Sequence, residues 1–261
     1  MRVYVDSLPG GSGNWDPGVL HELEAYKGLN LITVKREYNF GLRNNILHGL
    51  DDCSEHSDFF ICIEDDTVVS SEGIDSIVML FKSDLGARDN IGAVCATSFS
   101  LKSENNSWVP TDRFISWGWA TSSSTWQVFR SESSKPSPEQ LISQIPHTYS
   151  WPEKKFVRRM YVKFDDLDSW AIEFAHWNRL KGNIILRPPA NFMQLGLSGP
   201  STHASWAPKL PPASPSRVPP CISDANDVSK KLYSWVRFYR LIIGYLTYLS
   251  KFWRKLLLRA P

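Results

Sequence analysis

Apolar residues along the first two thirds of the chain alternate between short continuous runs and helical spacing. Short runs predict β strands, and apolar residues three and four positions apart predict helices. The predicted strands cover residues 3–5, 29–34, 59–63, 91–96 and 183–186, and the predicted helices cover residues 19–26, 42–50, 74–81 and 168–180. This order predicts a layered α/β domain with a mixed, mainly parallel sheet flanked by helices.

Segments rich in proline, glycine and serine interrupt this pattern. Residues 131–138 and 146–152 are expected to be loops, and residues 191–203 an irregular segment. A dense run of prolines between residues 207 and 220 has the composition of a linker. The sequence therefore predicts a domain over residues 1–206, a linker over 207–226 and a separate tail over 227–261.

The tail has the pattern of a basic amphipathic helix. At about 100° per residue, Arg240 and Lys251 fall on one face of a helical wheel and Trp235 and Trp253 on the other. The uncharged stretch between the two basic residues is far shorter than the roughly 20 residues that a membrane span needs. We expect residues 232–259 to contact a membrane surface, with docking on the domain or on a second copy as the alternative.

Composition and charge narrow the classes of function. The chain has 261 residues, a net charge of +2 and 42% hydrophobic residues, which is ordinary for a globular protein. Residues 1–200 contain no stripe of Lys and Arg with interleaved aromatics, so nucleic acid is not an expected partner. The four cysteines are far apart, which predicts reduced thiols. The first predicted strand follows Met1 directly, without a signal peptide, so we expect a cytoplasmic protein, peripheral on the inner membrane face if the tail binds lipid.

An acidic triplet ends the predicted strand at residues 59–63. It consists of Glu64, Asp65 and Asp66. In open α/β sheets, ligands bind beyond the carboxyl ends of the strands. Neighbouring carboxylates repel one another unless a cation lies among them, and hard oxygen ligands suit Mg²⁺ or Mn²⁺. The triplet therefore predicts a divalent-cation site, with a solvated loop as the alternative.

Three blocks, in order along the chain, resemble motifs of the GT-A glycosyltransferases. Residues 59–66 resemble the strand and DXD motif of that family, and residues 111–120 resemble its aromatic Gly-Trp loop. Residues 165–188 are similar to its acidic-Trp helix followed by a strand that ends in Arg-Pro. The likeness covers most of residues 1–206 and is greatest to the N-acetylglucosaminyltransferases that initiate complex N-glycans and to related bacterial sugar transferases. It implies a GT-A, Rossmann-like fold.

The resemblance also implies roles for individual residues. Asp66 would bind the metal directly, with Asp65 and Glu64 in support through the donor sugar or water, and His203 would lie near the diphosphate or metal. Asp168 matches the general base that takes a proton from the acceptor hydroxyl. From the residues alone, an aspartate that precedes a helical run is also a helix N-cap, so that alternative stays open.

The remaining implied contacts concern the donor and the sugar. Asp6 matches an acid that hydrogen-bonds the nucleobase. Arg43 and Asn44 occupy the positions of donor-loop residues. A sugar or acceptor pocket is implied at Trp117, Gly118 and Trp119, because aromatic rings stack on the apolar faces of sugars; core packing is the alternative for these residues.

The implied function is the metal-dependent transfer of a sugar, with inversion, from a nucleotide-sugar donor to an acceptor. A UDP-sugar is the favoured donor, Mn²⁺ or Mg²⁺ the expected cofactor, and a glycan or lipid-linked molecule the expected acceptor. Nucleotidyl transfer is less well supported, because the glycine-rich residues 10–13 lack a basic partner. Glycoside hydrolysis also uses two carboxylates, but it would not require the metal.

One departure from the family concerns the start of the domain. Family members carry a strand and an arginine-bearing loop ahead of the strand that ends at Asp6, whereas this chain begins at what would be the second strand. We therefore expect a sheet without the family's first strand. This departure supports the alternative function of a truncated, non-catalytic GT-A-like protein that acts as a membrane- or glycan-binding module.

Overall fold

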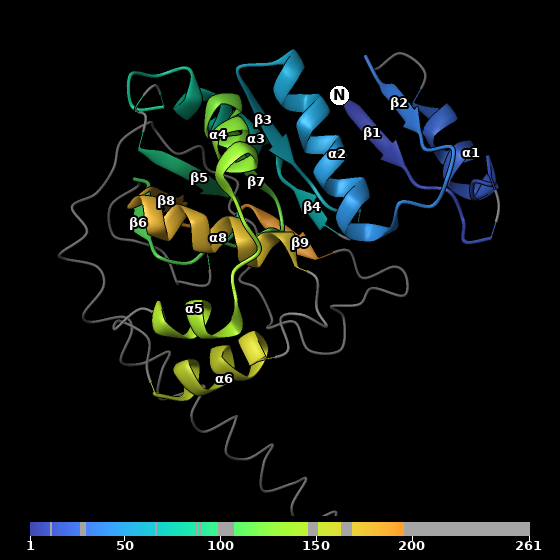
Figure 1. Cartoon of the computed structure of the whole chain (residues 1–261). Helices are drawn as coiled ribbons and strands as arrows, with labels where there is room; N and C mark the ends of the chain where they lie inside the picture. The colour runs from blue at the N-terminus through green and yellow to red at the C-terminus, as the bar shows by residue number, and fades with distance from the viewer. Residues whose placement is uncertain are drawn as a thin grey trace, which may run out of the picture.

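The chain folds into layers of helices packed on β sheets (Figure 1). The computed structural model describes residues 1–10, 12–26, 30–65, 67–86, 88, 90–98, 107–145, 151–162 and 169–195. The strands are β1 Arg2–Val5, β2 Ile32–Lys35, β3 Phe59–Cys62, β4 Thr67–Val69, β5 Ile91–Cys95, β6 Val109–Thr111, β7 Trp119–Ser122, β8 Ile184–Arg187 and β9 Met193–Leu195. The helices are α1 Pro17–Ala25, α2 Gly41–His56, α3 Ser71–Phe81, α4 Ser123–Glu132, α5 Pro138–Ser143, α6 Trp151–Val162 and α8 Trp170–Lys181.

A central sheet has the strand order β3-β7-β5-β8-β6. Strands β3, β5 and β8 run in the same direction, because β7 is antiparallel to both β3 and β5 while β8 is parallel to β5. Separately, β1 and β2 form a parallel pair, and β4 pairs with β9 in antiparallel orientation. A mixed sheet flanked by helices is thus confirmed. Antiparallel pairs outnumber parallel ones among the described strands, so the mainly parallel expectation applies only to β1–β2 and β5–β8.

Hydrophobic clusters cover both faces of the central sheet. On one face, aromatic side chains from the sheet pack against α4 and α8, and the centre of the Trp119 ring lies 5.1 Å from that of Phe174. On the other face, Ile77 and Leu80 of α3 pack against the sheet. Rings held edge-to-face or tilted at these separations attract one another in addition to burying apolar area. The aromatic face therefore fixes α8 firmly over the strands.

The ends of two helices follow from their sequences. Ser70 caps α3, because its hydroxyl accepts a hydrogen bond from the backbone N–H of Gly73 at 3.1 Å. Helix α8 ends at Gly182, which has a left-handed φ of 68°. The backbone N–H of Asn183 donates to the carbonyl of Asn178 at 2.9 Å, and β8 begins one residue later.

Most elements that the hydrophobic pattern predicts are present with shifted ends. The predicted strand 29–34 is β2, and the predicted helix 42–50 extends to His56. Sequence reasoning missed β4, β6 and β7 and the helices α4, α5 and α6. Within the segment expected to be irregular, residues 193–195 form β9.

The predicted linker over 207–226 and tail over 227–261 lie outside the described residues. Among the residues that the structure does describe, no helix is long and apolar enough to cross a membrane.

Gly118 allows a close approach of three strands. Its φ is 70°, and a Cβ added there would lie 2.9 Å from Cγ2 of Val69 and 3.3 Å from Cβ of Ala96. Its carbonyl also accepts a hydrogen bond from the backbone N–H of Ala96 at 2.8 Å. Gly182 has nearly the same φ of 68°, but an added Cβ there would meet nothing within 4 Å.

These two glycines separate backbone strain from crowding. Gly182→Ala is expected to lower the free energy of unfolding by about 1 kcal/mol, which is the cost of holding an alanine in the left-handed backbone conformation. Gly118→Ala is expected to cost about 2–4 kcal/mol, because crowding adds to the same strain. Urea unfolding of both variants measures the difference. Equal losses would contradict the close packing of β4, β5 and β7 around Gly118.

Candidate functional site

The acidic residues singled out in the sequence follow the carboxyl ends of two strands. Asp6 comes directly after β1, and Glu64 and Asp65 come within three residues of the end of β3. Ligand sites of open α/β sheets lie at this edge. Contacts between distant parts of the chain determine whether the residues belong to one site.

Asp6 ties the end of β1 to the start of α2. Its Oδ1 accepts hydrogen bonds from the backbone N–H of Ser7 at 3.0 Å and of Phe40 at 2.8 Å. Phe40 immediately precedes α2. Oδ2 accepts no hydrogen bond from the part of the chain that the structure describes. The carboxylate is therefore oriented by the loop while one oxygen remains for a ligand.

The acidic triplet begins a tight turn between β3 and β4. The carbonyl of Glu64 accepts hydrogen bonds from the backbone N–H of Thr67 at 3.1 Å and from its Oγ1 at 2.8 Å. Thr67 is buried, Glu64 is half-buried and Asp65 is exposed. The buried threonine therefore anchors the turn and leaves the Asp65 side chain toward solvent. Sequence reasoning did not include Thr67, although a hydroxyl residue directly after an acidic run is a common turn signal.

An ion pair joins the first turns of α2 and α8. Nη2 of Arg43 lies 2.8 Å from Oε1 and 2.7 Å from Oε2 of Glu173. The Glu173 side chain is only 7% exposed, so little water competes with the guanidinium. The first turns of α2 and α8 therefore lie next to each other, although the two residues are 130 positions apart in the sequence.

Strand pairing and aromatic contacts connect the end of β3, just before the acidic turn, to the start of α8. Cys62, the last residue of β3, is paired with Trp119 of β7. The ring centre of Trp119 lies 5.5 Å from that of Trp170, the first residue of α8. The acidic turn, the Asp6 loop and the start of α8 thus converge at one edge of the fold.

The electrostatics of Cys62 fit this arrangement. Burial raises the pKa of its thiol to about 12, and the charge of Glu64 adds to the effect. A thiol with this pKa stays protonated at neutral pH and is a poor nucleophile.

Several predicted site residues are engaged in packing or in an ion pair. The Trp119 side chain is fully buried and Trp117 is 9% exposed, so neither ring offers a face to a sugar. Gly118 is a close-packing glycine between strands. The aromatic core and the strand contacts enclose these three residues, which is the core-packing alternative; a sugar pocket at them stays a prediction. Arg43 is engaged with Glu173, whereas Asn44 is exposed on the first turn of α2.

Three predicted site residues, Asp66, Asp168 and His203, lie outside the described residues. Ser169, the neighbour of Asp168, is the N-cap position of α8. Within the described ranges, no group of three or more metal-ligating side chains comes together.

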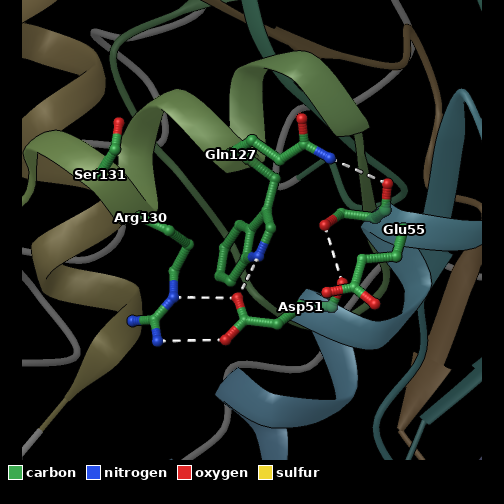
Figure 2. Close-up of a pocket in the computed structure, with 7 residues that line it drawn as sticks. Asp51, Glu55, Gln127, Arg130 and Ser131 are labelled. Carbon is green, nitrogen blue, oxygen red and sulfur yellow. Dashed lines mark hydrogen bonds and ion pairs between the residues drawn. The ribbon is translucent and has the colours of Figure 1, made fainter.

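A groove of about 510 Å³ lies elsewhere, between α2 and α4 (Figure 2). Asp51 is at its centre and accepts hydrogen bonds from Nε1 of Trp126 at 2.8 Å and from Nε and Nη2 of Arg130 at 2.9 and 3.1 Å. The groove lies along the second half of α2, away from the Arg43 end. Its carboxylate is already paired, so we assign the groove a role in joining the two helices.

Comparison with known proteins does not assign this edge a function. The chain matches no protein-family model and no curated protein.

The ion pair between α2 and α8 predicts an effect on stability. Arg43→Met is expected to lower the free energy of unfolding by about 2–4 kcal/mol, because it removes the guanidinium that lies 2.7 Å from the buried Glu173 carboxylate. The double variant Arg43→Met/Glu173→Gln is expected to recover more than half of that loss, because the negative charge of Glu173 is removed together with the positive charge of Arg43. Denaturant unfolding of both variants provides the test. A double variant no more stable than Arg43→Met would show that the pair is not what joins the helices.

Proposed function

We propose that this chain is a metal-dependent glycosyltransferase that uses a nucleotide-sugar donor, with a UDP-sugar favoured. The observation that carries the proposal is the convergence of three distant segments at one carboxyl edge. Asp6 holds the start of α2, Arg43 joins α2 to α8, and Cys62 and Trp119 lead from the acidic turn to Trp170. The GT-A resemblance assigns donor and catalytic roles to these same three segments.

The described carboxylates fit a hard divalent cation. Glu64 and Asp65 would supply oxygen ligands on the turn that Thr67 holds at the end of β3. Together with Asp66, these residues would hold Mn²⁺ or Mg²⁺ and leave coordination positions for diphosphate oxygens. The bound cation would neutralise charge that develops on the departing nucleoside diphosphate.

The other roles belong to the chain's own side chains. Asp6, oriented by Ser7 and Phe40, would accept a hydrogen bond from the nucleobase through Oδ2. Asp168, next to the N-cap of α8, would take the proton of the acceptor hydroxyl as its oxygen attacks the anomeric carbon. The new glycosidic bond forms on the face opposite the leaving diphosphate, so the configuration inverts. The acceptor in this proposal is a glycan or a lipid-linked molecule.

Nucleotide binding tests the donor site. We expect the full chain to bind UDP in the presence of Mn²⁺ and to lose most of that binding in EDTA, as measured by titration calorimetry. Asp65→Asn/Asp66→Asn is expected to weaken Mn²⁺-dependent binding at least tenfold. Asp84→Asn, at an exposed turn after α3, removes one negative charge away from this edge and is expected to leave binding unchanged.

The calorimetry also separates the alternatives. UDP binding that is equally tight in Mn²⁺ and in EDTA would show that the acidic turn and its metal do not contribute to nucleotide binding. The absence of UDP binding in both conditions would favour a non-catalytic GT-A-like module.

Substitution of the proposed base separates binding from turnover. Asp168→Asn is expected to lower UDP release from UDP-sugars by about 10²- to 10⁴-fold, the usual contribution of a general base, while the affinity for UDP with Mn²⁺ stays the same. Asp165→Asn and Asp166→Asn, two adjacent carboxylates, are the matched controls. A larger loss in either control than in Asp168→Asn would move the base to that neighbour.

A further inference from the structure

Two loops are bound to each other at the carboxyl ends of β1 and β2. The strands run parallel, so the loop after β1 and the loop that leads from β2 into α2 leave the pair at the same end (Figure 1). The backbone N–H of Gly13, in the first loop, donates to the carbonyl of Glu37, in the second, at 2.7 Å. The side-chain amide of Asn39 donates to the carbonyl of Ser7. The residue between the two anchored positions of the second loop is Tyr38.

The first loop is closed by its own hydrogen bonds. The backbone N–H of Leu8 donates to the carbonyl of Asn14 at 2.6 Å, and the hydroxyl of Ser7 donates to the same carbonyl at 3.3 Å. The loop that binds Glu37 and Asn39 is thus held in one shape. The backbone of Tyr38 is therefore held on both sides.

Tyr38 carries the one uncommitted aromatic ring of these two loops, which contain three. The indole of Trp15 donates to the carbonyl of Arg36 at 2.8 Å, and the Lys35 ammonium lies 5.2 Å from its ring centre. The Arg36 guanidinium lies 5.2 Å from the ring centre of Phe40. The Tyr38 side chain is 58% exposed and makes no hydrogen bond or ring contact with the part of the chain that the structure describes.

The free ring lies close to the free oxygen of Asp6. Oδ1 of Asp6 accepts the backbone N–H of Phe40 at 2.8 Å, whereas Oδ2 accepts no hydrogen bond from the described residues. Tyr38 is two residues before Phe40, so the two Cα atoms are at most about 7.6 Å apart, twice the spacing of consecutive Cα atoms. One small molecule can therefore contact both the carboxylate oxygen and the tyrosine ring.

An acceptor oxygen beside an exposed ring suits a planar heterocycle that carries an N–H at its edge. A nucleobase has both features, and proteins hold unpaired bases by stacking one face on an aromatic ring and bonding the edge. A phosphate would be repelled by the Asp6 carboxylate, and the hydroxyls of a sugar do not lie in the plane of an aromatic ring. The chemistry of this loop pair therefore fits the base of a nucleotide better than its diphosphate or its sugar.

We propose that Tyr38 stacks on the nucleobase of the donor while Oδ2 of Asp6 accepts a hydrogen bond from the edge of the same base. This inference rests on the proposed function for the identity of the ligand. It adds the residue that contacts the face of the base, which the sequence motifs do not indicate.

Nucleotide affinity tests the stack in the full chain. With Mn²⁺ present, Tyr38→Ala is expected to weaken UDP binding by about 5- to 150-fold, the usual effect of removing one base–aromatic stack. Tyr38→Trp is expected to bind UDP at least as tightly as the wild type, because an indole also stacks. Tyr26→Ala is the matched control: this tyrosine is 55% exposed and follows α1, before the amino end of β2, so UDP binding is expected to stay the same. Titration calorimetry measures all four proteins.

Two partial ligands separate the base from the diphosphate. Saturation-transfer NMR with uridine in EDTA is expected to detect the uracil ring protons with the wild type and Tyr26→Ala, and to lose most of that signal with Tyr38→Ala. Pyrophosphate with Mn²⁺ is expected to bind the wild type and Tyr38→Ala equally, because it has no base.

The outcomes distinguish this inference from the proposed function. Mn²⁺-dependent UDP binding that Tyr38→Ala leaves unchanged would overturn the stack and leave the transferase standing. Equal losses of UDP and pyrophosphate binding would also overturn it, because the ring would then act on something other than the base. Tyr38-dependent uridine binding without Mn²⁺-dependent UDP binding would support the stack and contradict a metal-dependent transferase. A wild type that binds neither uridine nor UDP would overturn both.

Discussion

The ion pair between Arg43 and Glu173 joins the two parts of the chain that build the candidate site. It connects the first turn of α2 to the first turn of α8, with the carboxylate almost fully buried. A carboxylate in that position is costly without a cation beside it, so the fold holds both helix starts together or loses the pair. The position of Asp6 depends on the start of α2, because its Oδ1 accepts a hydrogen bond from the backbone N–H of Phe40 just before that helix.

The aromatic core also holds the segments of the candidate site together. Trp119 lies beside both Phe60 of β3 and Trp170 of α8, so the strand that leads to the acidic turn is packed against the helix that follows Asp168. The turn itself is held by Thr67. Carboxylates from distant parts of the sequence thus reach one edge through packing and hydrogen bonds that do not involve their own charged ends.

The sequence predicted those elements whose hydrophobic pattern is strong. β1, β3, β5, β8, α2, α3 and α8 were predicted because each is a clear apolar run or a clear helical pattern. β7 was missed because it follows Gly118 inside a segment that resembled a loop, and its strand character comes from pairing with β3 and β5. β4 and β9 are each only three residues long and exist through each other, a long-range pairing that no local pattern indicates.

The candidate site was predictable in its acids and less so in its surroundings. Asp6, Glu64 and Asp65 follow strand ends, which a sequence indicates directly. The partner of Arg43 could not be predicted, because Glu173 lies 130 residues away within a helix. Trp119 was expected at a sugar pocket and lies in the core, because a tryptophan is equally suited to both and only the packing decides.

Paramagnetic broadening by Mn²⁺ tests most directly whether these segments form one site. In the isotopically labelled full chain, low Mn²⁺ with UDP is expected to broaden the backbone amide signals of residues 6–7, 40–41, 64–65 and 169–170 together. Signals of Asp51, Glu55 and Arg130, in the groove between α2 and α4, are expected to stay sharp. Broadening confined to that groove, or to only one of the four segments, would contradict a shared site at the carboxyl edge.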